Sequence, residues 1–159
     1  MLIRTPVGRI RSACVVLCAV LQTLAAHADQ RVWNPYYSSA SPRASASVDE
    51  EAAAVRQLNW RRSTLGLPAL ETQSAVAQAA QQHSAYLAQN NTTGHGETAG
   101  RPSFTGADPG ARLQAAGYGW QTYGEVISAG QATGTLAVES LMEAIYHRFG
   151  MLRSDVSHT

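Results

Sequence analysis

The chain has 159 residues, a length that fits one domain. Its 12 basic residues nearly balance its 11 acidic residues, so the charge does not point to a nucleic acid or an anionic membrane surface as the partner. Both cysteines, Cys14 and Cys18, lie near the N-terminus, which leaves the remainder without thiols for a disulfide framework or a thiolate metal site.

The first 28 residues have the pattern of a secretory signal peptide. A start with three arginines precedes the apolar run 13–24, which is too short to span a bilayer, and Ala26-His27-Ala28 is a small-x-small cleavage signal. An uncleaved membrane anchor is the alternative. Cleavage after Ala28 would leave nine arginines, eleven acids and no stable membrane anchor, and it predicts a secreted or periplasmic protein.

Residues 29–47 are rich in Ser, Ala and Pro without a period, and we interpret them as a linker before a domain that spans 48–159. Docking of the aromatic residues of this linker on the domain or on a partner is the alternative to a loosely ordered leader. Ser47 and Glu50 have the spacing of a capping box, which predicts a first helix that begins at Ser47 and stops at Gly66.

The second helix is predicted over about 72–89, with Asn90 and Asn91 at its end because asparagine tolerates the left-handed conformation. His83 lies on or beside its apolar stripe, and we interpret it as a hydrogen-bonded structural histidine, with a ligand role as the alternative. The segment 90–106 is dense in Gly, Thr, Asn and Pro and has no helical or strand period. A loop of this length in a small domain is usually functional or disordered, and the periodic segments on both sides favour function.

A short helix and a strand are predicted after this loop. The sequence Asp108-Pro109-Gly110 opens the helix, with Asp as the N-cap and Pro at the first helical position. Residues 124–128 form the best strand candidate, because two β-branched residues follow a glycine. A strand would place Glu125 and Ile127 on one face and Val126 on the other.

A last helix is predicted to begin at Thr133 or Thr135 and to end near His147. That histidine is one of four polar groups at special positions: His95, Glu97, Glu125 and His147. Two imidazoles and a carboxylate suit zinc or another divalent cation with a water in an open position, and a further carboxylate would serve as general base. On spacing alone, scattered surface residues are the alternative, because the groups are spread over about fifty residues and no His-Glu-x-x-His helix is present. A nucleophilic site is not favoured, since the chain has no Gly-x-Ser-x-Gly elbow.

Five short motifs follow one another between Asp49 and Leu152. They are Leu58-Asn59-x-x-Arg62-x-x-x-Gly66-Leu67-Pro68-x-Leu70, Ala79-Ala80-x-x-His83-Ser84-x-Tyr86-Leu87, His95 with Phe104-Thr105-Gly106 and Ala115-Ala116-Gly117-Tyr118, Gly124-Glu125-Val126-Ile127, and Ala137-Val138 with Tyr146-His147-Arg148. In this order they resemble the CAP superfamily (SCP domain), which comprises cysteine-rich secretory proteins, antigen 5 and pathogenesis-related proteins. The third motif resembles the bacterial branch of that superfamily.

The resemblance implies an α+β fold, an α-β-α sandwich in which helices pack on both faces of a small antiparallel sheet. It implies a binding cleft lined by His and acidic residues, for which the candidates are His95, Glu97, Glu125, Glu143 and His147. The metal ligands would be His95, His147 and Glu125. Val126 and Leu141 depart from the family pattern, which usually has Asn and Trp at these positions. The family continues with further strands, so we expect a sheet that is incomplete at the C-terminus.

Three hypotheses for function follow. The first is a secreted binding module that presents its cleft to a lipid, a cell-envelope component or a protein partner, without turnover. The second is a metal-dependent hydrolase that uses His95, Glu125 and His147. The third is a structural fragment without activity. Members of the family that the chain resembles are mostly non-enzymatic or unassigned, which favours the first hypothesis, and the sequence leaves open whether the protein is an enzyme.

Overall fold

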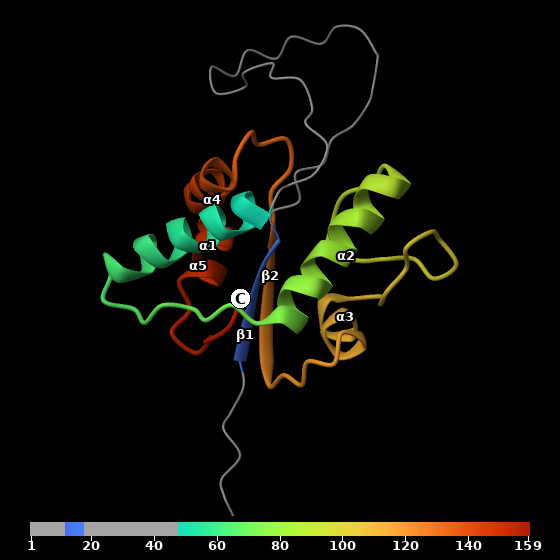
Figure 1. Ribbon diagram of the computed structural model, residues 1–159, viewed down its shortest axis with the longest axis horizontal. Coiled ribbons are helices and arrows are strands. Elements are labelled where there is room, and N and C mark those ends of the chain that lie inside the picture. Colours follow the sequence, from blue (N-terminus) through green and yellow to red (C-terminus); the bar gives the residue numbers. More distant parts are fainter. Residues whose placement is uncertain (1–11, 18–47) are drawn as a thin grey trace, which may run out of the picture.

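The structure is a computed structural model that describes residues 12–17 and 48–159. Its elements are β1 (Ser12–Leu17), α1 (Val48–Ser63), α2 (Ser74–Asn90), α3 (Pro109–Ala115), β2 (Thr122–Ile127), α4 (Gly134–Glu143) and α5 (Ile145–Met151). Helices α1, α4 and α5 lie on one side of the strand pair, and α2 and α3 lie on the other (Figure 1). This arrangement confirms the predicted α+β class with helices on both faces of a small sheet. Within the described residues, no helix has the length and apolar character that a bilayer crossing requires.

The two strands pair in parallel, with Ser12 opposite Thr122 and Leu17 opposite Ile127. This parallel pairing differs from the antiparallel sheet that the family resemblance implies. Three helices lie between β1 and β2 along the chain, and a long connection of this kind allows a chain to return in the same direction, as parallel pairing requires. Strand β1 overlaps the apolar run 13–24 assigned to the signal peptide, where neighbouring valines favour an extended chain. The rest of the predicted signal peptide and the linker 29–47 lie outside the described residues.

The helix ends follow the signals in the sequence. Asp108 and Thr133 each accept a hydrogen bond from the main-chain N–H three residues further on, as N-caps of α3 and α4. Asn91 ends α2 in the left-handed conformation, with φ 46° and ψ 51°. Two predictions differ. Helix α1 ends at Ser63, before the predicted stop at Gly66. The last helix is divided into α4 and α5, because Ala144 between them is extended, with φ −86° and ψ 117°.

Alternate side chains of strand β2 pack into the hydrophobic clusters on its two opposite faces. Val126 packs with residues of the α1, α4 and α5 side: Ala54, Leu58, Leu70, Val138, Leu141, Met151 and Val156. Tyr123 and Ile127 pack on the α2 and α3 side, against clusters that contain Val76, Ala79, Leu113, Tyr118, Tyr86 and Leu87. The predicted alternation is therefore confirmed, and it assigns Glu125 to the side of α2 and α3.

Helices α1 and α4 meet closely. Glu50 Oε2 accepts a hydrogen bond of 2.6 Å from the main-chain N–H of Gly134. This N–H belongs to the first turn of α4, whose donors have no acceptor within the helix. A Cβ atom at Gly134 would lie 2.0 Å from the main-chain oxygen of Glu50, so the contact requires glycine. Further along, Glu139 accepts hydrogen bonds from Gln57 and Arg61, and the bond from Arg61 is the main reason why the pKa of Glu139 lies below its ordinary value.

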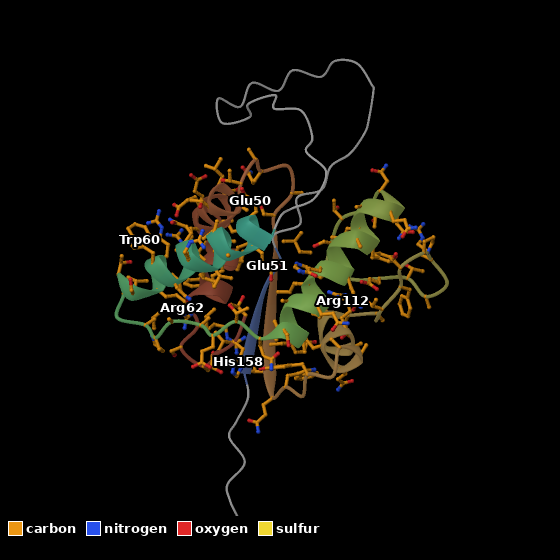
Figure 2. All side chains as sticks on the ribbon, viewed as in Figure 1. Glu50, Glu51, Trp60, Arg62, Arg112 and His158 are labelled. Carbon is orange, nitrogen blue, oxygen red and sulfur yellow. The ribbon has the colours of Figure 1, made fainter. Side chains whose placement is uncertain are left out.

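Two fully buried arginines lie on opposite sides of the sheet (Figure 2). Arg62, on the side of α1 and α5, donates hydrogen bonds of 2.8 to 2.9 Å to the main-chain carbonyls of Pro68, Met151 and Arg153. These bonds join the end of α1 to the end of α5. Arg112, on the side of α2 and α3, has carboxylate partners, and it is the centre of the candidate site.

Candidate functional site

Helix α3 brings Arg112 into a narrow space between the loop 91–107 and β2. Two glycines permit this approach. A Cβ atom at Gly106 would lie 2.7 Å from the main-chain nitrogen of Arg112, and one at Gly110 would lie 2.7 Å from the ring of Trp120. The guanidinium is therefore held between the long loop and the strand that carries Glu125.

Glu125 orients the ring of His95. Glu125 Oε2 lies 2.7 Å from His95 Nδ1, and Glu125 Oε1 accepts a hydrogen bond of 2.7 Å from Arg112 Nη2. The side chain of Glu125 is 3% exposed, whereas that of His95 is 53% exposed. Because the carboxylate paired with Arg112 acts as an acceptor, the neutral imidazole carries its proton on Nδ1 and keeps a lone pair on Nε2.

Glu97 anchors the loop from inside. Its side chain is fully buried, and Oε1 lies 2.8 Å from His83 Nδ1. Oε2 accepts hydrogen bonds from the main-chain N–H groups of Thr105, at 2.7 Å, and Gly106, at 3.2 Å. The structure therefore corrects the expectation that Glu97 lines a cleft, because both of its oxygens face the interior of the protein.

The pKa of Glu97 reflects this environment. Burial alone would raise it, but the hydrogen bonds from Thr105, His83 and Gly106 and the charge of Arg112 outweigh burial and hold the pKa below its ordinary value. Arg112 Nε lies 3.8 Å from Glu97 Oε1. The carboxylate is therefore ionised at neutral pH.

His83 is the innermost group of the cluster and is fully buried. Its Nε2 lies 3.0 Å from the main-chain oxygen of Gly94, which can only accept, and its Nδ1 faces the ionised Glu97. Nε2 therefore carries a proton that it donates to this carbonyl, and the contact between Nδ1 and Glu97 Oε1 is a hydrogen bond between two fully buried side chains. The ring also stacks on Tyr86, with centroids 6.2 Å apart. The interpretation of His83 as a hydrogen-bonded structural histidine is confirmed.

The cluster thus runs from the interior to the surface through five side chains: His83, Glu97, Arg112, Glu125 and His95. The guanidinium of Arg112 lies between the two carboxylates, and His83 and His95 contact one carboxylate each. His95 at the surface end is the one member of the cluster with a large exposed area.

Comparison with protein families agrees with this architecture. Residues 55–159 match the model of the CAP family, the cysteine-rich secretory protein family. The chain belongs to the CAP family. No curated protein and no solved structure matches the chain. Members of the CAP family are typically extracellular, and a CAP domain indicates a binding module of extracellular type.

The CAP domain brings together only part of the predicted site. His95 and Glu125 contact each other, whereas Glu143 is exposed at the end of α4 and His147 is half-buried on α5. Helix α5 packs on the face of β2 that carries Val126, where a Cβ atom at Gly150 would lie 3.5 Å from Val126 Cγ1. Among the described residues, no three His, Cys, Asp or Glu side chains form a group that could hold a metal ion.

Sequence reasoning missed Arg112, the residue at the centre of the cluster. One signal was available, because Arg112 is the charged residue of a short helix that is otherwise apolar except for Gln114. A charged side chain in the last turn of such a helix is usually solvated. Only the close packing of the loop and β2 around α3 shows that this arginine is buried and paired.

Proposed function

We propose that this CAP domain is a secreted or periplasmic binding module whose ligand contacts the loop 91–107 at His95. The observation that supports the proposal is the hydrogen bond between His95 Nδ1 and Glu125, which holds a half-exposed imidazole in one orientation. The two buried carboxylates are engaged by His83, Arg112, His95 and main-chain N–H groups. Because both carboxylates are engaged in this way, Nε2 of His95 is the group of the cluster that is left to meet a ligand.

The chemistry of His95 limits what the ligand must provide. The lone pair on Nε2 is an acceptor, so the ligand must bring a hydrogen-bond donor such as a hydroxyl, an amide or an ammonium group. Arg101 and Phe104 are exposed on the same loop and offer a positive charge and an apolar ring. A cell-envelope glycan, a lipid with a hydroxylated headgroup and a protein partner all carry such donors, and the glycan carries the most.

The loop is already ordered for this role. Beyond the Glu97 anchor, the main-chain N–H of Thr98 donates to the hydroxyl of Tyr86 at 2.9 Å, and Asn90 Nδ2 donates to the main-chain oxygen of Pro102 at 2.9 Å. A binding loop that is held in one conformation loses less entropy when its ligand binds.

Thermal stabilisation of the protein tests the proposal. Cell-envelope glycan fragments and vesicles of neutral or anionic lipid are titrated separately, and a ligand of the folded state raises the melting temperature with concentration. Replacement of His95 by alanine is expected to weaken the binding of that ligand about tenfold or more. This is the loss that corresponds to one hydrogen bond between neutral groups. His147→Ala is the matched control, since this histidine lies on α5, and it should leave affinity unchanged. Binding that survives His95→Ala and is lost in His147→Ala would contradict the proposal.

One observation favours a second candidate, the metal-dependent hydrolase expected to use His95, Glu125 and His147, although His147 lies on α5, which packs on the face of β2 opposite to Glu125. Histidines that bind a metal usually donate their other ring N–H to a carboxylate, as His95 does to Glu125. In that case Nε2 would be the ligand and Glu125 would orient the ring, which differs from the direct ligation expected from the sequence. Zinc or another divalent cation would supply an activated water there.

Calorimetric titration with Zn²⁺ separates the two candidates. The hydrolase requires near-stoichiometric zinc that is lost in both His95→Ala and His147→Ala. Zinc content that does not change in either variant would remove this candidate and leave the binding module.

A further inference from the structure

Arg112 joins the surface end of the cluster to its interior. Its side chain is 1% exposed, its Nη2 donates to Glu125 Oε1 at 2.7 Å, and its Nη1 donates to the main-chain oxygen of His95 at 3.0 Å. Its Nε faces Glu97 at 3.8 Å. One guanidinium therefore holds both the carboxylate behind the His95 ring and the main chain that carries that ring.

We propose that Arg112 is a positioning residue that acts through Glu125 to keep the proton of the neutral His95 ring on Nδ1 and the lone pair on Nε2. The terminal torsion of a glutamate side chain is broad, so an unpaired carboxylate would present its oxygens in many orientations. Pairing of Oε1 with Arg112 leaves Oε2 directed at His95 Nδ1. The inference rests on the proposed role of His95 as the contact to the ligand.

The role requires arginine and not only a positive charge. The planar guanidinium presents Nη1 and Nη2 as a fork, and here the two nitrogens reach acceptors on different segments, the loop and β2. A lysine ammonium is a single point of donation and cannot reproduce the fork. The variant Arg112→Lys therefore keeps the charge that Glu97 and Glu125 need and removes the alignment of Glu125.

The chain offers a matched control in Arg62. It is also fully buried, but it lies on the other side of the sheet and donates to main-chain carbonyls (Figure 2). Arg62→Lys disturbs a buried guanidinium to a similar degree without touching His95. Any general effect of a buried Arg-to-Lys change will therefore occur in both variants.

The test is the tautomer of His95, read from the imidazole ¹⁵N shifts and two-bond couplings at pH 8. The unmodified protein is expected to show the form with the proton on Nδ1. Arg112→Lys should change the ratio of the two tautomers about tenfold towards the form with the proton on Nε2, the factor that corresponds to one charge-assisted hydrogen bond. Arg62→Lys should leave the ratio unchanged. A wild-type ratio in folded Arg112→Lys would overturn the proposal.

A second measurement uses the unmodified protein and so does not depend on the folding of any variant. The guanidinium protons of Arg112 should exchange with solvent at least about tenfold more slowly than those of the exposed Arg101, because they are buried and bonded. Equal exchange rates would overturn the proposal. If both results hold while no glycan or vesicle binds, the Arg112 inference stands and the proposed function fails.

Discussion

Replacement of Glu97 by glutamine removes one negative charge from the buried cluster and preserves its shape. The carboxylate accepts hydrogen bonds from His83 and from the main-chain N–H groups of Thr105 and Gly106, at 2.8, 2.7 and 3.2 Å. Removal of one partner of a buried ion pair costs about 3–5 kcal/mol, because the other charge is left uncompensated. We expect Glu97→Gln to lower the free energy of unfolding at pH 7 by this amount, which corresponds to about 12 °C or more in melting temperature.

The difference between the two proteins should depend on pH. The pKa of Glu97 in the folded state lies below its ordinary value of 4.5. The stability that the charge contributes is therefore fully present above pH 4.5, and it is lost as the pH falls through the lower pKa of the folded state. Glu97→Gln lacks this contribution at every pH, so the difference between the two stabilities should shrink progressively as the pH falls below 4.5.

Urea denaturation at pH 7 and pH 3.5, followed by circular dichroism, measures both effects. Glu139→Gln is the control, because Glu139 also has a lowered pKa but its side chain is 30% exposed beside Arg61, and a surface pair of this kind contributes about 1 kcal/mol or less. A loss in Glu97→Gln no larger than that in Glu139→Gln, or a loss that is the same at both pH values, would refute the reasoning.

Three further predictions concern the scaffold and are measured by urea denaturation at pH 7. Arg62→Met should lower the free energy of unfolding by about 3 kcal/mol, because three main-chain carbonyls lose their donor. A loss below about 1 kcal/mol would mean that water replaces the guanidinium. Gly134→Ala should lower the free energy of unfolding by about 3 kcal/mol, because its methyl group would lie 2.0 Å from the main-chain oxygen of Glu50. Gly119→Ala, where no atom lies within 4 Å of the added Cβ, should change it by less than about 0.5 kcal/mol. Equal effects of these two glycine variants would contradict the close contact of α1 and α4. Asn91→Ala should cost about 1 kcal/mol at φ 46° while Asn91→Gly costs less, and the reverse order would show that the left-handed cap is not strained.

The local features of the fold could be predicted because each depends on neighbours in the chain. Asp108 and Thr133 cap donors three residues away, and Asn91 adopts a conformation that its own side chain tolerates. The alternation of Glu125 and Val126 across β2 is a property of an extended backbone. The direction of the strand pair was not predictable in this way, because it depends on where a chain of about a hundred residues returns to the sheet.

For the candidate site, the sequence determined the types of group available and the long loop that carries two of them, His95 and Glu97. It also determined that Glu125 would lie on a strand. Tertiary structure alone decided that Glu97 faces inward to His83, that Arg112 lies between the two acids, and that His147 belongs to the layer on the other side of β2. The physical reason is distance along the chain. Glu97 is 14 residues from His83, and Glu125 is 13 residues from Arg112. Only the packing of separate helices, loop and strand brings these groups together in the protein interior, where a buried charge must be paired.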